Sequence, residues 1–364
     1  MRLGVEAAVV DGALVPGDVA IANGTIADVA LGKRSGRGIA VPGFVDLHVN
    51  GFGGVDFAAA DVDGYRRAGE ALLETGVTAF QPTFITAPED DLVAALNAIP
   101  SEPIGPRIIG AHLEGPFLSP ARLGAHPTDA RRDPDNALLE RLLDAGPVSQ
   151  MTLAPELAGA LELVDVLQER GVVVSCGHSN ATAEQAAAAF ERRVRTVTHL
   201  FNAMPPFSHR DPGLAGAALA RDDIVLQVIL DGQHLADETA ALVWKAAAGR
   251  VALVTDAVAA TGVGDGRYRL GGVDVEVRDG VARRAEDGVL AGSVTTMLDG
   301  IRKLHSLGAP LAEAVAAATS VPARLVKGVG GVLRAGGDAD LVILDDRLEV
   351  RAVFVGGKEL VAVG

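Results

Sequence analysis

Residues 44–51 read FVDLHVNG, a largely apolar run that ends in polar side chains. Further runs of the same kind follow at 77–84, 108–115, 150–157, 172–179, 196–202, 224–232 and 251–257. Strands of a parallel sheet are covered by helices on both faces, so they tend to be apolar along their whole length. Each of these eight runs is therefore predicted to be a buried strand of one parallel sheet.

Amphipathic helical patterns separate most of these runs. Clear examples lie at 64–76, 136–146 and 237–249, where apolar residues recur at helical spacing. Eight alternating strand–helix units make up a (β/α)8 barrel. We predict an α/β protein whose TIM barrel spans residues 43–328, with a β-hairpin inserted near 262–288.

The two ends of the sequence differ from its middle. Short alternating runs with the turn dipeptides Asp11-Gly12 and Asn23-Gly24 precede the barrel. The same pattern of short strand-like runs returns near Gly330. We predict one small β-sandwich domain formed from residues 1–42 and 329–364, with the barrel inserted between its two parts.

Composition argues against several classes of partner. The formal net charge of −15 disfavours binding to nucleic acid and to anionic membrane surfaces. The single cysteine, Cys176, cannot form an intramolecular disulfide and is typical of a reducing compartment. The sequence shows neither a signal-peptide pattern nor an apolar run of the ~18 residues that a membrane helix needs. We expect a cytoplasmic enzyme that acts on a small molecule.

Titratable side chains gather at the predicted strand ends. In a (β/α)8 barrel, functional residues project from the carboxyl ends of the strands. The residues that meet this condition are His48, Glu114, His178, His199, His234 and Asp256. A single buried histidine is usually a hydrogen-bonded core residue, but this many titratable groups at one end of a barrel indicate a site.

The set suits metal-assisted hydrolysis. One glutamate with two histidines is an established zinc ligand set that leaves a position for water, and the metal lowers the pKa of that water to ~7. Such chemistry also needs an acid/base group. Asp256 stands alone among apolar residues and is the natural candidate, the alternative being a turn or helix cap.

Phosphate recognition requires hydrogen-bond donors, which the sequence offers at two places. Asn202 and Ala203 lie just after a predicted strand, where backbone N–H groups can face an anion. Arg210 carries a guanidinium fork that suits phosphate oxygens, although a plain surface charge is the alternative. His112 shares a strand face with Glu114 and is assigned no role.

Six short motifs carry a family resemblance. They are VPGFVDLH (41–48), HLEGP (112–116), CGHSNA (176–181), THLFNAM (198–204), DGQH (231–234) and VTDA (254–257). In this order and spacing they resemble the amidohydrolase superfamily and, within it, the N-acetylglucosamine-6-phosphate deacetylase family. The resemblance runs over about residues 41–325, and it is specific because several motifs occur together.

The resemblance implies roles for individual residues. It makes Glu114, His178 and His199 the metal ligands, and Asp256 the general base that later serves as general acid. It makes His126 the residue that polarises the acetamide carbonyl and binds substrate. The implied reaction converts N-acetyl-D-glucosamine 6-phosphate to D-glucosamine 6-phosphate and acetate, in amino-sugar catabolism and cell-wall recycling.

One motif departs from the superfamily pattern. Many members carry His-X-His at the end of the first strand, which supports a second metal, whereas this sequence has His48-Val49-Asn50. Asn50 offers no imidazole ligand, so we expect one divalent metal per subunit, with His48 and Asn50 orienting water or neighbouring groups. A weak second metal site that uses His48 is the remaining alternative. We expect zinc, although iron, cobalt and manganese suit the same donors.

The resemblance also implies an assembly, and it leaves alternatives. In the resembled family the equivalents of Arg210 and His234 reach the neighbouring active site, so we expect a homodimer. The closer alternative function is another amidohydrolase, acting on N-acetylgalactosamine 6-phosphate or on a cyclic amide. The more distant one is a non-catalytic sugar-phosphate binder, which predicts a lost ligand or a lost Asp256.

Overall fold

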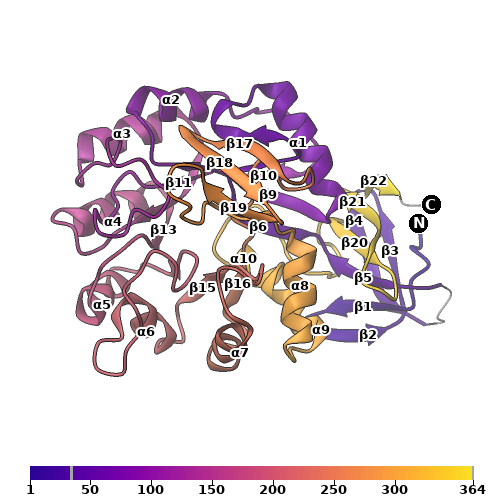
Figure 1. The fold of residues 1–364 in the computed structure, drawn as a ribbon. Coiled ribbons are helices and arrows are strands. Elements are labelled where there is room, and N and C mark those ends of the chain that lie inside the picture. Colours follow the sequence, from indigo (N-terminus) through magenta and orange to yellow (C-terminus); the bar gives the residue numbers. More distant parts are fainter. Residues whose placement is uncertain (33–35, 363–364) are drawn as a thin grey trace.

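A computed structural model describes residues 1–32 and 36–362, with a barrel and a smaller sheet domain beside it (Figure 1). The barrel strands are β6 (Phe44–Val49), β9 (Val77–Ile85), β11 (Ala111–Glu114), β12 (Val148–Leu153), β13 (Val173–Cys176), β14 (Thr196–Val197), β15 (Val225–Val228) and β16 (Val251–Leu253). Neighbours in this series pair in parallel and in chain order. The short β10 (Arg107–Ile108) also pairs with β9. The predicted parallel strands are confirmed.

Backbone contacts between the first and last strands close the barrel. The N–H of Asp256 donates to the carbonyl of His48 at 2.9 Å, and the N–H of Asn50 donates to the carbonyl of Ala257 at 2.8 Å. Val49 and Ala257 form a parallel bridge. Closure therefore brings His48 and Asp256, which lie far apart in the sequence, into contact.

Helices surround the barrel, and their capping and burial account for the sequence patterns. In α1 (Val62–Glu74), the side chain of Asp61 accepts a hydrogen bond from the N–H of Gly64, while Tyr65 and Leu72 are buried. The other helices are α2 (Glu89–Asn97), α3 (Asn136–Ala145), α4 (Ala160–Glu169), α5 (Ala183–Glu191), α6 (Gly213–Leu219), α7 (Asp237–Ala246), α8 (Met297–Ser306), α9 (Leu311–Ala317), α10 (Ser320–Ala323) and the 3-10 helix η1 (Phe57–Ala59). Within the described ranges, no helix has both the length and the apolar character needed to cross a membrane.

Strands from both parts of the chain form the small domain, at the right of Figure 1. Its sheet has the order β2 (Ala13–Pro16), β1 (Ala7–Val10), β5 (Ile39–Pro42), β20 (Leu341–Leu344), β21 (Val350–Val355) and β22 (Lys358–Ala362). A second layer, the hairpin β3 (Asp18–Ala22) and β4 (Thr25–Leu31), shares a core with this sheet through Ile21, Ile26 and Phe354. The exact limits at 42/43 and 328/329 stay a prediction.

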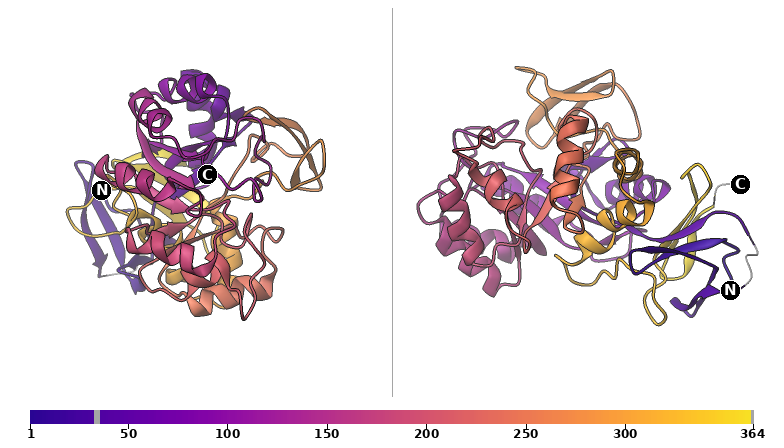
Figure 2. Two further views of the ribbon diagram at one scale, coloured as in Figure 1. Left: turned by 90° about the vertical axis from the view of Figure 1, so that its left-hand side faces the viewer. Right: turned by 90° about the horizontal axis from the view of Figure 1, so that it is seen from below.

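The segment predicted as a hairpin forms three antiparallel strands: β17 (Gly266–Leu270), β18 (Val273–Arg278) and β19 (Val281–Arg284). The third strand exists because the chain turns again at Asp279 and Gly280, whose φ values of 51° and 71° are those of a tight turn. This inserted sheet projects from the barrel in both views of Figure 2. Its apolar face packs on Ile85 and Ala125, which belong to the barrel and to the loop after β11.

Candidate active site

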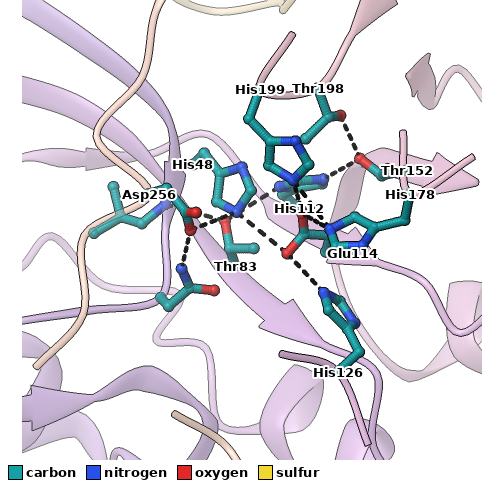
Figure 3. Close-up of polar contacts among 12 residues, drawn as sticks. His48, Thr83, His112, Glu114, His126, Thr152, His178, Thr198, His199 and Asp256 are labelled. Carbon is teal, nitrogen blue, oxygen red and sulfur yellow. Dashed lines mark hydrogen bonds and ion pairs between the residues drawn. The ribbon is translucent and has the colours of Figure 1, made fainter. Parts of the chain in front are cut away.

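The predicted metal ligands come together at one end of the barrel. Glu114 ends β11, while His178 and His199 each lie two residues beyond the ends of β13 and β14. The Oε1 atom of Glu114 lies 3.2 Å from Nε2 of His178 and 2.9 Å from Nε2 of His199, and the two Nε2 atoms are 3.0 Å apart. Figure 3 shows these buried side chains pointing at one another.

The protonation of His178 fits this residue for metal binding. Its Nδ1 lies 2.9 Å from the carbonyl oxygen of Arg122. A carbonyl oxygen only accepts hydrogen bonds, so Nδ1 carries the proton and Nε2 presents its lone pair to Glu114 and His199. Lone pairs and a carboxylate that converge in a buried space repel one another unless a cation lies among them. The donor set therefore fits a divalent metal such as zinc.

The backbone is strained where it delivers these side chains. His178, His199 and Asp256 have φ values of 46°, 29° and 50°. Positive φ is uncommon for residues other than glycine and persists where the surrounding structure holds it, often at functional sites. This strain turns the side chains of residues just beyond the strands into the mouth of the barrel.

Asp256 is held as a carboxylate beside the ligand set. Its Oδ1 lies 3.1 Å from Nε2 of His48 and accepts a hydrogen bond from Nδ2 of Asn50 at 2.6 Å. Burial opposes the charged form, but the attraction and hydrogen bond of His48 outweigh it and lower the pKa of Asp256. An ionised carboxylate can accept a proton, and Asp256 lies on the pocket wall.

His126 presents an N–H donor to the same space. Its Nδ1 accepts a hydrogen bond from the backbone N–H of Thr86 at 3.2 Å, so the ring proton of the neutral form lies on Nε2. Nε2 is 3.3 Å from Oε2 of Glu114. Such a donor suits a carbonyl oxygen that gains negative charge during hydrolysis. Thr86 had no signal in the sequence, because its contact with His126 depends on how the loop after β11 folds back.

His112 lies one layer below the ligands and is fully enclosed. Its Nε2 is 2.7 Å from Oγ1 of Thr152, and its Nδ1 is 3.2 Å from Oγ1 of Thr83. Its ring meets the ring of His48 edge to face, with the centroids 4.7 Å apart. Burial lowers the pKa of His112 well below its usual value, so this neutral ring supports His48 by packing.

Most of the predicted site residues line one pocket together with apolar neighbours. Its polar wall comprises Glu114, His126, His178, His199, His234 and Asp256, and its apolar wall comprises Ile85, Ala125, Leu270, Val289 and Leu290. Asn202, Ala203 and two glycines complete the lining. An apolar wall with a few converging polar groups suits a small-molecule substrate.

The predicted anion-binding groups differ in whether they are free to face the pocket. The backbone N–H of Asn202 donates to the carbonyl of His199, so it is not free to face a phosphate. The N–H of Ala203 donates to none of the described residues and remains available on the pocket wall. Arg210 is exposed and does not line this pocket.

His234 lines the pocket of its own chain, and the reach into a neighbouring subunit that the resemblance implies stays a prediction. Its Nδ1 lies 2.7 Å from Oδ2 of Asp231, whose Oδ1 accepts the backbone N–H groups of Gln233 and His234, each at 2.9 Å. Asp231 therefore orients His234. The DGQH motif could have predicted this contact, because an aspartate three residues before a histidine in a loop can accept hydrogen bonds from the backbone N–H and from the ring of that histidine.

Comparisons with known proteins identify the family of this chain. A model of the amidohydrolase family matches residues 39–360. The chain is 39% identical over 345 residues to the N-acetylglucosamine-6-phosphate deacetylase of Rattus norvegicus, with 90% of this chain and 84% of that protein covered. It is 36% identical over 355 residues to the N-acetylgalactosamine-6-phosphate deacetylase of Escherichia coli O157:H7, with 93% of each covered.

A solved structure has the same fold over the whole chain. It is a mutant N-acetyl-D-glucosamine-6-phosphate deacetylase from Mycobacterium smegmatis in complex with N-acetyl-D-glucosamine-6-phosphate. The TM-score is 0.94 at 38% identity, with 100% of this chain and 99% of that chain covered. More distant structures, such as an enamidase at 15% identity and a TM-score of 0.62, share the fold alone.

Proposed function

This chain belongs to the amidohydrolase family, and from that premise we propose that it hydrolyses N-acetyl-D-glucosamine 6-phosphate to D-glucosamine 6-phosphate and acetate. The observation that carries the proposal is one pocket that holds a buried Glu/His/His set, the carboxyl group of Asp256 and the N–H donor of His126. Metal-assisted amide hydrolysis uses a metal, an acid/base group and a donor to the oxyanion. The proposed substrate is taken from the names of the relatives above.

The proposed reaction adds water to the carbonyl carbon and breaks the amide C–N bond. A divalent metal held by Glu114, His178 and His199 would supply Lewis acidity, which acidifies water and polarises the carbonyl. Asp256 accepts the proton that the water gives up and, once protonated, delivers it to the departing amine nitrogen. His126 donates its Nε2–H to the carbonyl oxygen as negative charge develops there.

We propose one metal per subunit, with zinc as the expected ion and iron, cobalt and manganese as alternatives. We take His48 as a partner of the carboxylates and not as a second metal ligand, with its Nε2 3.1 Å from Oδ1 of Asp256 and 3.4 Å from Oε2 of Glu114. Asn50 directs its amide N–H at Asp256 and so acts as a positioning group. Metal analysis of protein made without added metal tests this, and two tightly held ions per chain would contradict it.

The first experiment measures acetate release from N-acetylglucosamine 6-phosphate. Chelator-stripped protein should be inactive and should regain activity as each metal is returned separately. A protein that binds the sugar phosphate without releasing acetate would instead be a non-catalytic binder, which the presence of all three ligands and Asp256 disfavours. Hydrolytic ring opening of a cyclic amide, without acetate release from the sugar phosphate, would indicate a cyclic amidase.

The galactosamine epimer is the second candidate substrate. The Escherichia coli relative carries the name of that activity at 36% identity, close to the value for the glucosamine relatives. The two sugars differ only in the orientation of one ring hydroxyl. We expect the higher kcat/KM on the glucosamine substrate, and a reversed ratio would assign the chain to the other epimer.

We propose that the enzyme is a cytoplasmic homodimer in which Arg210 meets the phosphate bound in the neighbouring subunit. Support comes from the exposed segment that carries Arg210 together with Phe207, whose side chain is 54% exposed. An exposed aromatic beside an arginine is typical of an interface. The single buried Cys176 is compatible with a reducing compartment.

Subunit mixing tests the shared site. Arg210→Ala chains keep Asp256, and Asp256→Asn chains keep Arg210, so each homodimer should be nearly inactive. Mixed dimers combine both residues at one of their two sites, and random exchange should restore about a quarter of wild-type activity. The readout is acetate release after mixing, with each variant incubated alone as its control. Activity equal to the sum of the two separate variants would place Arg210 outside the neighbouring site.

Replacement of Asp231 by Asn should weaken substrate binding through His234. The amide can accept the two backbone N–H groups, but its NH2 then faces Nδ1–H of His234, so the ring must change tautomer or turn. We expect KM to rise about tenfold with kcat changed little, as for a lost binding contact. The matched control is Asp237→Asn, an exposed carboxylate that pairs with Lys303. A fall in kcat without a change in KM would contradict the positioning role.

A further inference from the structure

The apolar wall of the pocket is a feature that the hydrolytic mechanism does not use. It contains Ile85, the last residue of β9, and Leu270, the last residue of β17 in the inserted sheet. Both side chains are buried, at 5% and 4% exposure, and they belong to one apolar cluster with Ala125. The wall thus joins the barrel to the insertion.

This wall flanks the group that meets the acyl oxygen. Ile85 directly precedes Thr86, whose N–H holds Nδ1 of His126, and Ala125 directly precedes His126 itself. The acyl methyl is bonded to the same carbon as the oxygen that His126 meets in the proposed reaction, which brings the methyl within reach of these residues. The hydroxyl and phosphate groups of the sugar need hydrogen-bond partners, which apolar side chains cannot provide.

A half-buried carboxylate, that of Asp56, holds the insertion against the wall. Oδ2 of Asp56, at the end of β8 (Val55–Asp56), accepts the N–H of Gly271 at 2.8 Å, and Oδ1 accepts the N–H of Ala58 at 3.1 Å. Gly271, in the turn between β17 and β18, has φ of +53°, and a Cβ added there would lie 3.3 Å from Cγ1 of Ile85. The turn is therefore in close contact with the barrel wall at this point.

On the basis of the proposed deacetylase function, we propose that Ile85 and Leu270 determine acyl-chain length by closing the pocket around a methyl group. Asp56 is a positioning residue that keeps Leu270 in place through the Gly271 turn. The inserted sheet is then a specificity element: it forms the far side of the acyl site and excludes chains longer than acetyl.

The test compares N-acetyl-, N-propionyl- and N-butyryl-glucosamine 6-phosphate as substrates. In wild-type protein, each added methylene should lower kcat/KM by about tenfold or more. In Ile85→Ala and Leu270→Ala, the propionyl-to-acetyl ratio of kcat/KM should rise about tenfold. Asp56→Asn should raise the same ratio by a smaller factor, because it loosens the turn without changing the wall.

The control is Val277→Ala, which removes the same kind of side chain from the buried face of the same sheet but does not line the pocket. Its ratio should equal that of the wild type. Ile85→Val and Leu270→Val serve where an alanine variant fails to fold, as judged by circular dichroism and metal content. Unchanged ratios in the folded wall variants, or an equal rise in Val277→Ala, would overturn the proposal. Wild-type protein that releases no acetate at all would instead refute the deacetylase function itself.

Discussion

Asp256→Asn should lower kcat for acetate release by about 10²–10⁴-fold while the metal content stays at the wild-type level. The amide keeps the size of the side chain but cannot accept a proton from water or return one to the amine. Its position beside His48 and Asn50 also places an NH2 group where a carboxylate oxygen accepts hydrogen bonds. The measurement is steady-state acetate release together with metal analysis of the same preparation.

Asp222→Asn, at an exposed carboxylate after α6, is the matched control and should behave like wild type. A variant at Asp256 that retains near-normal kcat would remove this residue from the acid/base role. Loss of metal from the Asp256 variant would show that the carboxylate binds metal as well, and the fall in kcat would then need reassignment.

Removal of the proposed metal ligand Glu114 should lower activity as strongly, through loss of the metal. In Glu114→Gln the charge that draws a cation between His178 and His199 is lost, and so is an anionic ligand. We expect the purified variant to hold far less metal than wild type and to be as inactive as chelator-stripped protein. Added zinc should restore the stripped wild type but not the variant.

His305→Ala is the control for histidine loss elsewhere, because Nδ1 of His305 bonds the carbonyl of Ala309 in the loop after α8. Metal content and turnover of this variant should match wild type. A Glu114→Gln variant that retains full metal and activity would contradict the assigned ligand set.

Much of the fold could be predicted because it depends on periodic burial. The barrel strands are buried on both faces, so their sequences are apolar throughout, and α1 shows its buried stripe at helical spacing. The inserted sheet was predicted less well. A second turn at Asp279-Gly280 adds a third strand, and this dipeptide resembles many loops that do not pair with a further strand.

The site could be predicted where the fold alone decides position. Strand ends of a parallel barrel meet at one rim, which brings Glu114 to His178 whatever the loops do. The contacts of Thr86 with His126 could not be predicted, because they depend on the path of a long loop. The hydrogen bond from the Asn202 N–H to the carbonyl of His199 could not be predicted either, because it depends on a turn geometry that many sequences adopt.

The small domain cannot be completed until both ends of the chain have been synthesised, because its sheet contains strands from both ends. β5 lies at the middle of its sheet, between β1 and β20, yet β20 is synthesised only after the whole barrel. During translation the edge of β5 that will pair with β20 is therefore unpaired. An unpaired strand edge is a template for pairing with other chains. The amino-terminal strands complete their sheet only when β20 emerges, so the order of synthesis makes this domain the last part of the molecule to become whole.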